Sequence, residues 1–124
     1  NHKWEHIVAI NQSGMYPASI ISDNLNLPLL AKKDASNTTT NNDLVVVDII
    51  SNGKTIRNVN SDVFTIFSYN FYHKDNIYVL CDFNAVIDVA LEKNYLNAQE
   101  ASNLLSWQKK PKQWVENYLT MKLL

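Results

Sequence analysis

Apolar, β-branched runs recur along the chain, and several of them are continuous rather than alternating between apolar and polar residues. A strand covered on one face alternates, whereas a strand of a parallel sheet with helices on both faces is apolar throughout. The runs therefore predict an α/β fold with an open, mostly parallel sheet of about five strands, flanked by helices. The predicted strands are Glu5–Ile10, Leu27–Lys32, Leu44–Ile50, Val63–Tyr69 and Ile77–Asp82.

The connection between the first two predicted strands is expected to contain a helix, whereas the connection between the third and fourth is short. Pro17 suits the first position of a helix whose Ala18, Ile21 and Leu25 share one face, which makes the first two strands a βαβ unit. After Thr55 the chain leaves room for only about two helical turns, which is short for a parallel crossover.

The C-terminal third predicts helices and completes a single domain over residues 1–124. Asn84 is expected to cap the first helix, and Asn97 with Glu100 approximates a capping box for the second. Pro111 starts the last helix, whose apolar face we interpret as core or dimer packing rather than a ligand pocket. That face consists of Trp114, Val115, Tyr118 and Leu119.

Charge and cysteine content limit the partners and the compartment. The 11 Lys and Arg against 12 Asp and Glu give no net field that would draw nucleic acid or an anionic membrane. The apolar runs are far shorter than the roughly 20 residues that span a bilayer, and no signal pattern begins the sequence. Cys81 has no disulfide partner, so we expect a buried thiol and a cytoplasmic protein. The histidines have no spacing that predicts a metal site.

The two glycines of the chain each follow a predicted strand, Gly14 in AINQSGMYPA and Gly53 in VVVDIISNGKTI. Glycine lets backbone amides approach a phosphate, and such loops lie where open α/β sheets bind ligands. A tight turn is the alternative for either glycine alone. The ending Gly53-Lys54-Thr55 is not a P-loop, because that motif requires a glycine where Asp48 stands.

The run VVVDIISNGKT resembles the phosphoribosyl diphosphate (PRPP) signature of type I phosphoribosyltransferases, an apolar strand with two acids before a Ser/Thr-Gly loop. The segment IFSYNF and the helical tail that follows are similar to the C-terminal part of orotate phosphoribosyltransferases. The resemblance covers nearly the whole chain, from Trp4 to Trp114. It implies an enzyme of pyrimidine biosynthesis that joins orotate and PRPP to give orotidine 5′-monophosphate and pyrophosphate. It also implies that the enzyme is a homodimer.

The resemblance also implies roles for individual residues. Asp48 would hydrogen-bond a ribose hydroxyl of PRPP and is the one catalytic candidate. The 5′-phosphate would lie within the loop that follows, and the pyrophosphate, with Mg²⁺, near the Gly14 loop. The implied 5′-phosphate ligands are Ser51, Asn52, Gly53, Lys54 and Thr55, and the implied pyrophosphate ligands are Gln12, Ser13, Gly14 and Lys33.

Four features depart from the family pattern. Val47 stands where the first acid is expected, and the family's mobile loop aligns with Asp34–Asp43, which contains no lysine or histidine. The N-terminal region that helps to build the orotate pocket and a helix after Thr55 have no counterpart. A minimal enzyme, a catalytically degenerate phosphoribosyl-binding or assembly module, and a piece of a longer enzyme all fit this pattern.

Overall fold

The computed structural model describes residues 3–32 and 42–123 and divides the chain into two compact units, Asn1–Asp82 and Phe83–Leu124. The N-terminal unit holds the sheet, and the described part of the C-terminal unit is helical. The predicted loop at Asp34–Asn42 lies almost entirely outside the described residues, as does Lys33. A single domain over residues 1–124 stays a prediction.

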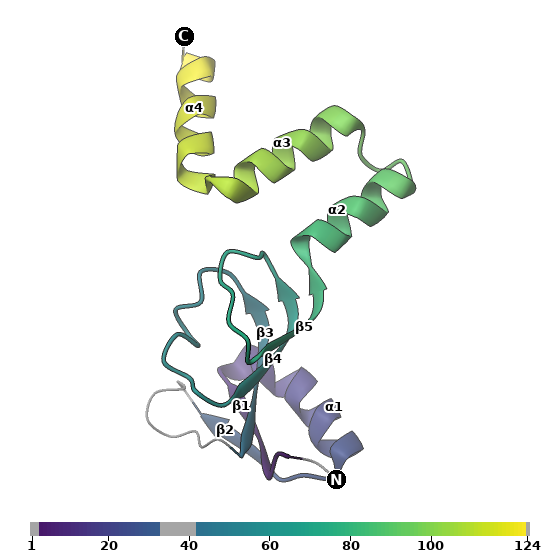
Figure 1. Ribbon diagram of the computed structural model, residues 1–124, viewed down its shortest axis with the longest axis vertical. Coiled ribbons are helices and arrows are strands. Elements are labelled where there is room, and N and C mark those ends of the chain that lie inside the picture. Colours follow the sequence, from purple (N-terminus) through teal and green to yellow (C-terminus); the bar gives the residue numbers. More distant parts are fainter. Residues whose placement is uncertain (1–2, 33–41, 124) are drawn as a thin grey trace. The chain divides into compact units, whose positions relative to one another are not determined.

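The N-terminal unit is built on a five-stranded sheet of order β2-β1-β3-β4-β5, in which every pairing is parallel (Figure 1). This confirms the predicted parallel sheet. The strand bounds differ from the predicted ones by at most two residues, because the continuous apolar runs mark the buried strands closely. The strands are β1 (His6–Ile10), β2 (Leu29–Lys32), β3 (Asp43–Ile50), β4 (Asp62–Ser68) and β5 (Ile77–Asp82).

Helix α1 (Met15–Leu25) joins β1 to β2 and covers one face of the sheet, which confirms the predicted βαβ unit. Ala18 is fully buried there, and Ile21 and Leu25 pack against the same apolar cluster. Pro17 lies at the third position of α1 and not at its first. The cluster is centred on Ile7, Ala9, Ala18, Leu44 and Val46.

The opposite face of the sheet is covered by irregular chain rather than by helices. Its buried cluster combines strand residues with Ile56 and Val59 from the β3–β4 connection, and Tyr72 from the β4–β5 connection packs against it. Figure 1 shows both connections on the side of the sheet away from α1. The strand residues of this cluster are Val8, Ile10, Val45, Val47, Ile50 and Val63.

The β3–β4 connection, which the sequence leaves too short for more than about two helical turns, contains no helix. Residues 54–58 form hydrogen-bonded turns, with the Ile56 N–H donating to the Gly53 carbonyl (3.2 Å) and the Val59 N–H to the Ile56 carbonyl (3.0 Å). Gly53 has a φ of 82°, a conformation that no right-handed helix contains. The turns bury Ile56 and Val59 on the sheet, so a crossover without a helix still covers this face.

The C-terminal unit contains α2 (Phe83–Glu92), α3 (Ala98–Lys109) and α4 (Pro111–Leu123). Helices α2 and α3 are joined by contacts between the rings of Phe83 and Trp107, with centroids 5.6 Å apart, and by a hydrogen bond of 2.9 Å from Gln108 Nε2 to Asn84 Oδ1. Asn84 is therefore not the predicted cap, because α2 begins one residue before it and its side chain accepts from α3.

Two further predictions concern α3 and α4. The capping box at the start of α3 is confirmed: the Asn97 side chain accepts from the Glu100 N–H (2.8 Å), and the Glu100 carboxylate accepts from the Asn97 N–H (3.0 Å). Pro111 begins α4 as predicted. Val115 and Leu119 of α4 remain about half exposed, so packing of that apolar face against a second chain stays a prediction.

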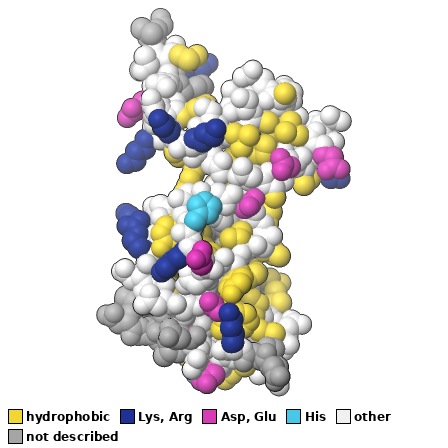
Figure 2. All heavy atoms as spheres, in the orientation of Figure 1, with side chains coloured by type: hydrophobic (Ala, Val, Ile, Leu, Met, Phe, Trp, Pro, Cys, Tyr) yellow, Lys and Arg dark blue, Asp and Glu magenta, His cyan; other side chains and the backbone are white. Residues whose placement is uncertain are grey.

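The surface agrees with the balanced charge of the sequence. Figure 2 shows Lys and Arg side chains in several separate places, with Asp and Glu side chains between them. Within residues 3–32 and 42–123, no helix is both long and apolar enough to cross a membrane. Cys81 lies on β5 as predicted, where its free thiol is half-buried rather than fully buried.

Candidate ligand-binding site

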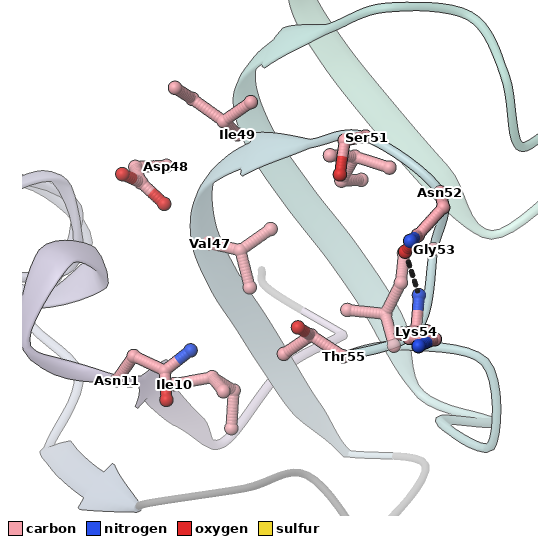
Figure 3. Close-up of a pocket in the computed structure, with 12 residues that line it drawn as sticks. Ile10, Asn11, Val47, Asp48, Ile49, Ser51, Asn52, Gly53, Lys54 and Thr55 are labelled. Atoms are coloured by element: carbon pink, nitrogen blue, oxygen red, sulfur yellow. Dashed lines mark hydrogen bonds between the residues drawn. The ribbon is translucent and has the colours of Figure 1, made fainter. Parts of the chain in front are cut away.

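The strand order creates a topological switch point between β1 and β3. From β1 the chain continues through α1 to β2 on one side, whereas β3 lies on the other side and leads on to β4. Open α/β sheets bind ligands at the carboxyl ends of the strands beside such a point. A pocket lies there, lined by Ile10, Asn11, Val47, Asp48, Ile49, Ile50, Ser51, Asn52, Gly53, Lys54, Thr55 and Ile56 (Figure 3).

The strand register opens this pocket. Pairing between β1 and β3 ends at Ala9 with Val46, whereas β3 and β4 stay paired as far as Ile50 with Ser68. The last residues of β3 therefore extend beyond their neighbour β1. The pocket has a volume of about 50 Å³. That is the space of a few water molecules, which suits one phosphate group and not a whole nucleotide.

The loop at Ser51–Thr55 forms one wall of the pocket, and Figure 3 shows it curving away from β3 and returning at Thr55. Gly53 takes a positive φ of 82°, and the Asn52 side-chain oxygen accepts from the Lys54 N–H at 3.0 Å. The loop offers backbone N–H groups, two hydroxyls and the Lys54 ammonium, all of them hydrogen-bond donors. Such a set is suited to an anion.

Asp48 lies on β3 directly before this loop and lines the same pocket. Its side chain is half-buried, and no partner of its carboxylate is found in the described part of the chain. Its backbone is fixed, because the buried Thr65 hydroxyl on β4 donates to the Asp48 carbonyl at 3.0 Å. A carboxylate with free acceptor sites beside a phosphate-sized pocket can accept hydrogen bonds from sugar hydroxyls.

Val47 precedes Asp48 and, because strand residues alternate between faces, its side chain points to the other face of the sheet. It is 4% exposed and packs in the apolar cluster with Val45 and Ile56. The side chain therefore packs in the core, and the residue is also part of the pocket lining. Among the described residues that line the pocket, Asp48 is the one with a carboxylate side chain.

The Gly14 loop is built differently from the Gly53 loop. Residues Gln12–Gly14 form a short 3-10 helix that leads into α1, with Gln12 and Ser13 exposed and Gly14 buried. A Cβ atom on Gly14 would lie 2.8 Å from the Val46 carbonyl oxygen, so close packing against β3 accounts for this glycine. Gln12 alone of these three lines an open hollow next to the pocket, together with Asn11, Met15, Ala31 and Lys32.

Comparison with known proteins reveals relatives of this architecture. No protein-family sequence model matches the chain, and no curated protein sequence matches it. Solved structures do match: the UMP synthase of Leishmania donovani superposes with a TM-score of 0.67 at 11% identity, over 89% of this chain and 29% of that chain. The orotate phosphoribosyltransferase of Aeropyrum pernix superposes with a TM-score of 0.50 at 9% identity, over 76% of this chain and 67% of that chain. The chain has a phosphoribosyltransferase-like fold.

This phosphoribosyltransferase-like fold confirms the architecture that the PRPP-like run and the helical tail implied. Identities of 11% and 9% support the fold and not a shared reaction. The chain spans 29% of the UMP synthase chain and 67% of the orotate phosphoribosyltransferase chain. The roles of the individual site residues therefore depend on the geometry of the pocket itself.

Sequence reasoning missed Asn11 in the pocket lining and Tyr72 behind the pocket loop. Asn11 lines both the pocket and the adjoining hollow, and it takes φ 63° and ψ 167°, a backbone conformation found almost only in glycine. Its position directly after a strand was the available signal, since asparagine tolerates positive φ better than most residues. Tyr72 packs against Gly53 from the β4–β5 connection, and no local pattern indicated that contact.

The phosphoribosyltransferase-like fold implies Mg²⁺, and the pocket offers a limited fit for it. No group of three or more His, Cys, Asp or Glu side chains is placed to hold a metal ion in the described ranges. Mg²⁺ is commonly held by one or two carboxylates together with substrate phosphates. Asp48 is the one acidic side chain of the pocket lining, so the residues fit an ion that arrives with a phosphorylated ligand.

Proposed function

We propose that the chain binds a phosphoribosyl ligand in the pocket at the end of β3 and is an orotate phosphoribosyltransferase-like protein. In that reaction the phosphoribosyl group of PRPP is transferred to orotate, giving orotidine 5′-monophosphate and pyrophosphate. The observation that carries the proposal is the pocket itself: at the switch point, a phosphate-sized space is enclosed by a donor-rich loop and bordered by Asp48.

Different pocket residues bind different parts of the ligand. The Ser51–Thr55 amides, hydroxyls and ammonium hold the 5′-phosphate, and the Asp48 carboxylate accepts from the ribose hydroxyls on the β1 side of the strand. The pyrophosphate then extends over Asn11 towards the hollow that Gln12 lines. Binding and orientation supply the catalysis, and Mg²⁺ bound with the ligand supplies charge compensation for the departing pyrophosphate.

The site residues predicted for pyrophosphate receive unequal support. Gln12 borders the hollow, Ser13 is exposed beside it, and Gly14 is buried against Val46, so Gly14 shapes the loop from behind. Lys33 lies outside the described residues. A homodimer, which the orotate phosphoribosyltransferase resemblance implies, and a cytoplasmic location, which the unpaired Cys81 favours, complete the proposal.

A second candidate function is binding of a phosphoribosyl ligand without turnover. The observation in its favour is Val47, which is buried in the apolar core where the family pattern has an acid. A pocket with one carboxylate retains hydrogen bonds to the ribose and loses part of the charge around the reacting centre, which lowers the rate more than the affinity.

One assay separates the two candidates. The protein is mixed with orotate, PRPP and Mg²⁺, and the orotate absorbance is followed; a transferase consumes orotate, and Asp48→Ala abolishes the loss. A rise in melting temperature with PRPP but no loss of orotate selects binding without turnover. No response of either signal to PRPP rejects both functions.

A further inference from the structure

The proposed phosphate-binding loop has no helix behind it, so another part of the fold must hold its shape. The β3–β4 connection, residues 51–61, contains no helix. A loop that is free to change shape binds an anion weakly, because ordering its backbone on binding costs about 1–2 kcal/mol per residue. The β4–β5 connection, residues 69–76, runs on the same side of the sheet (Figure 1).

The β4–β5 connection contacts the end of β3 and the β3–β4 connection at several points, one of them a hydrogen bond from the Asn76 side-chain amide to the Ser61 carbonyl. Near the sheet, the Tyr69 N–H donates to the Ile50 carbonyl at 3.1 Å. Further along both connections, the Lys74 ammonium donates to the Val59 carbonyl at 3.0 Å. Between these two hydrogen bonds, the ring of Tyr72 lies directly against Gly53. The central contact therefore falls on the middle residue of the proposed phosphate-binding loop.

The contact between Gly53 and Tyr72 is close enough to constrain the glycine. A Cβ atom on Gly53 would lie 2.4 Å from Cγ of Tyr72 and 2.6 and 2.8 Å from its Cδ atoms. The ring thus occupies the space that any other residue would need there. The same ring packs against the buried cluster that contains Ile56, which anchors the end of the loop. Gly53 holds its positive φ of 82° between that ring and the pocket.

We infer that Tyr72 is a positioning residue for the phosphate-binding loop. Its ring does not line the pocket and acts through Gly53, whose conformation fixes the direction of the neighbouring amides. The connection that carries Tyr72 takes over the supporting role of the missing helix. The inference rests on the proposed function, because it concerns the binding of a phosphorylated ligand at that loop.

The test compares Tyr72→Ala with Tyr72→Phe, which keeps the ring and removes only the hydroxyl. Tyr95→Ala, at a tyrosine that is 76% exposed, is the matched control for losing a tyrosine. Tyr72→Leu keeps apolar cover over the buried cluster and replaces Tyr72→Ala if that variant does not fold. Two quantities are measured well below each melting temperature: the affinity for PRPP with Mg²⁺ by calorimetry, and amide hydrogen exchange in the free proteins.

The exchange reporters are the amides of Lys54 and Ile56, both hydrogen-bonded within the loop, with Val45 and Val46 of the central strand as internal references. We expect Tyr72→Ala to weaken PRPP binding by about tenfold or more and to accelerate exchange at the loop but not at the strand. Tyr72→Phe and Tyr95→Ala should match the wild type. A merely structural role would accelerate exchange at loop and strand together and leave the affinity of the folded variant unchanged.

Two results overturn the inference: equal PRPP affinity of the wild type and Tyr72→Ala, or loop exchange that does not change. If the wild type itself binds no PRPP, the proposed function fails. Hydrogen exchange then decides by itself whether Tyr72 fixes the loop, so the two failures are distinguishable.

Discussion

Thr65 on β4 donates a hydrogen bond to the carbonyl of Asp48 on β3, with 3.0 Å between Oγ1 and the carbonyl oxygen. Thr65 is fully buried, so the bond is made out of contact with water. A neighbouring strand thus fixes the backbone of the one acidic residue in the pocket. The carboxylate of Asp48 remains available for a ligand, while its main chain is part of the sheet.

Replacing Thr65 by valine should lower the free energy of unfolding by about 1–2 kcal/mol, because a buried carbonyl loses its donor while the side-chain volume is nearly kept. Chemical denaturation measures the loss. Thr120→Val is the control, since the Thr120 hydroxyl donates to the Glu116 carbonyl on an exposed part of α4; its effect should stay within about 0.5 kcal/mol. Equal effects of the two variants would contradict a structural role for Thr65.

Introducing the acid that the family pattern has at position 47 should damage the fold instead of restoring a second ribose ligand. Val47 is 4% exposed within an apolar cluster, so Val47→Asp buries an unpaired carboxylate. We expect a loss of roughly 3 kcal/mol or more. Val47→Ala, the size control, should cost less. A stable Val47→Asp variant with tighter PRPP binding would show that the side chain can reach the pocket.

Gly14 and its neighbour Ser13 give a test of why the first glycine is needed. A Cβ atom at Gly14 meets the Val46 carbonyl oxygen at 2.8 Å, and the backbone of the central strand cannot give way cheaply. Gly14→Ala should therefore lower the free energy of unfolding by about 1–3 kcal/mol, whereas Ser13→Ala, at an exposed position, should not. If Gly14→Ala keeps full stability but loses PRPP binding, the glycine serves the ligand and not the packing.

Acid should weaken the contacts that tie the N-terminal segment to β4. Burial raises the pKa of Asp62, but hydrogen bonds from Trp4 (2.9 Å) and Lys3 (3.0 Å) outweigh it, so the pKa falls below the ordinary value of 3.8. A lowered folded pKa stabilises the protein above the unfolded pKa, and the stabilisation is lost as pH falls through the folded value. Asp62→Asn should therefore flatten the acid side of the stability profile, measured by denaturation between neutral pH and about pH 3.

The control for this pH experiment is Asp23→Asn, at an exposed position on α1. It should leave the acid side of the profile as steep as in the wild type. An Asp62→Asn profile that is equally steep would show that the contacts to Trp4 and Lys3 contribute nothing to acid stability.

The sheet could be predicted from the sequence because its information is local. In Leu44–Ile50 every residue except Asp48 is apolar, and the Asn97–Glu100 capping box is a short-range pattern. The pocket loop could also be predicted from local information, since Asp48 and Gly53 lie within a few residues of each other and of the end of β3.

The parts that could not be predicted depend on contacts between distant residues. Tyr72 meets Gly53 from another connection, and the Val46 carbonyl explains Gly14 from another strand. The way the chain covers the sheet after Thr55 has the same origin, because Ile56 and Val59 are held by burial on the sheet and not by a helical pattern. Sequence periodicity reports none of these contacts.

Calorimetric titration of the protein with PRPP in the presence of Mg²⁺ tests the proposed pocket most directly. The pocket geometry predicts saturable binding to the wild type, binding that is about ten- to a hundredfold weaker in Asp48→Ala, and wild-type affinity in Asp23→Ala. A wild type that binds no PRPP, or an Asp48→Ala variant that binds it as tightly as the wild type does, would contradict a phosphoribosyl site at the end of β3.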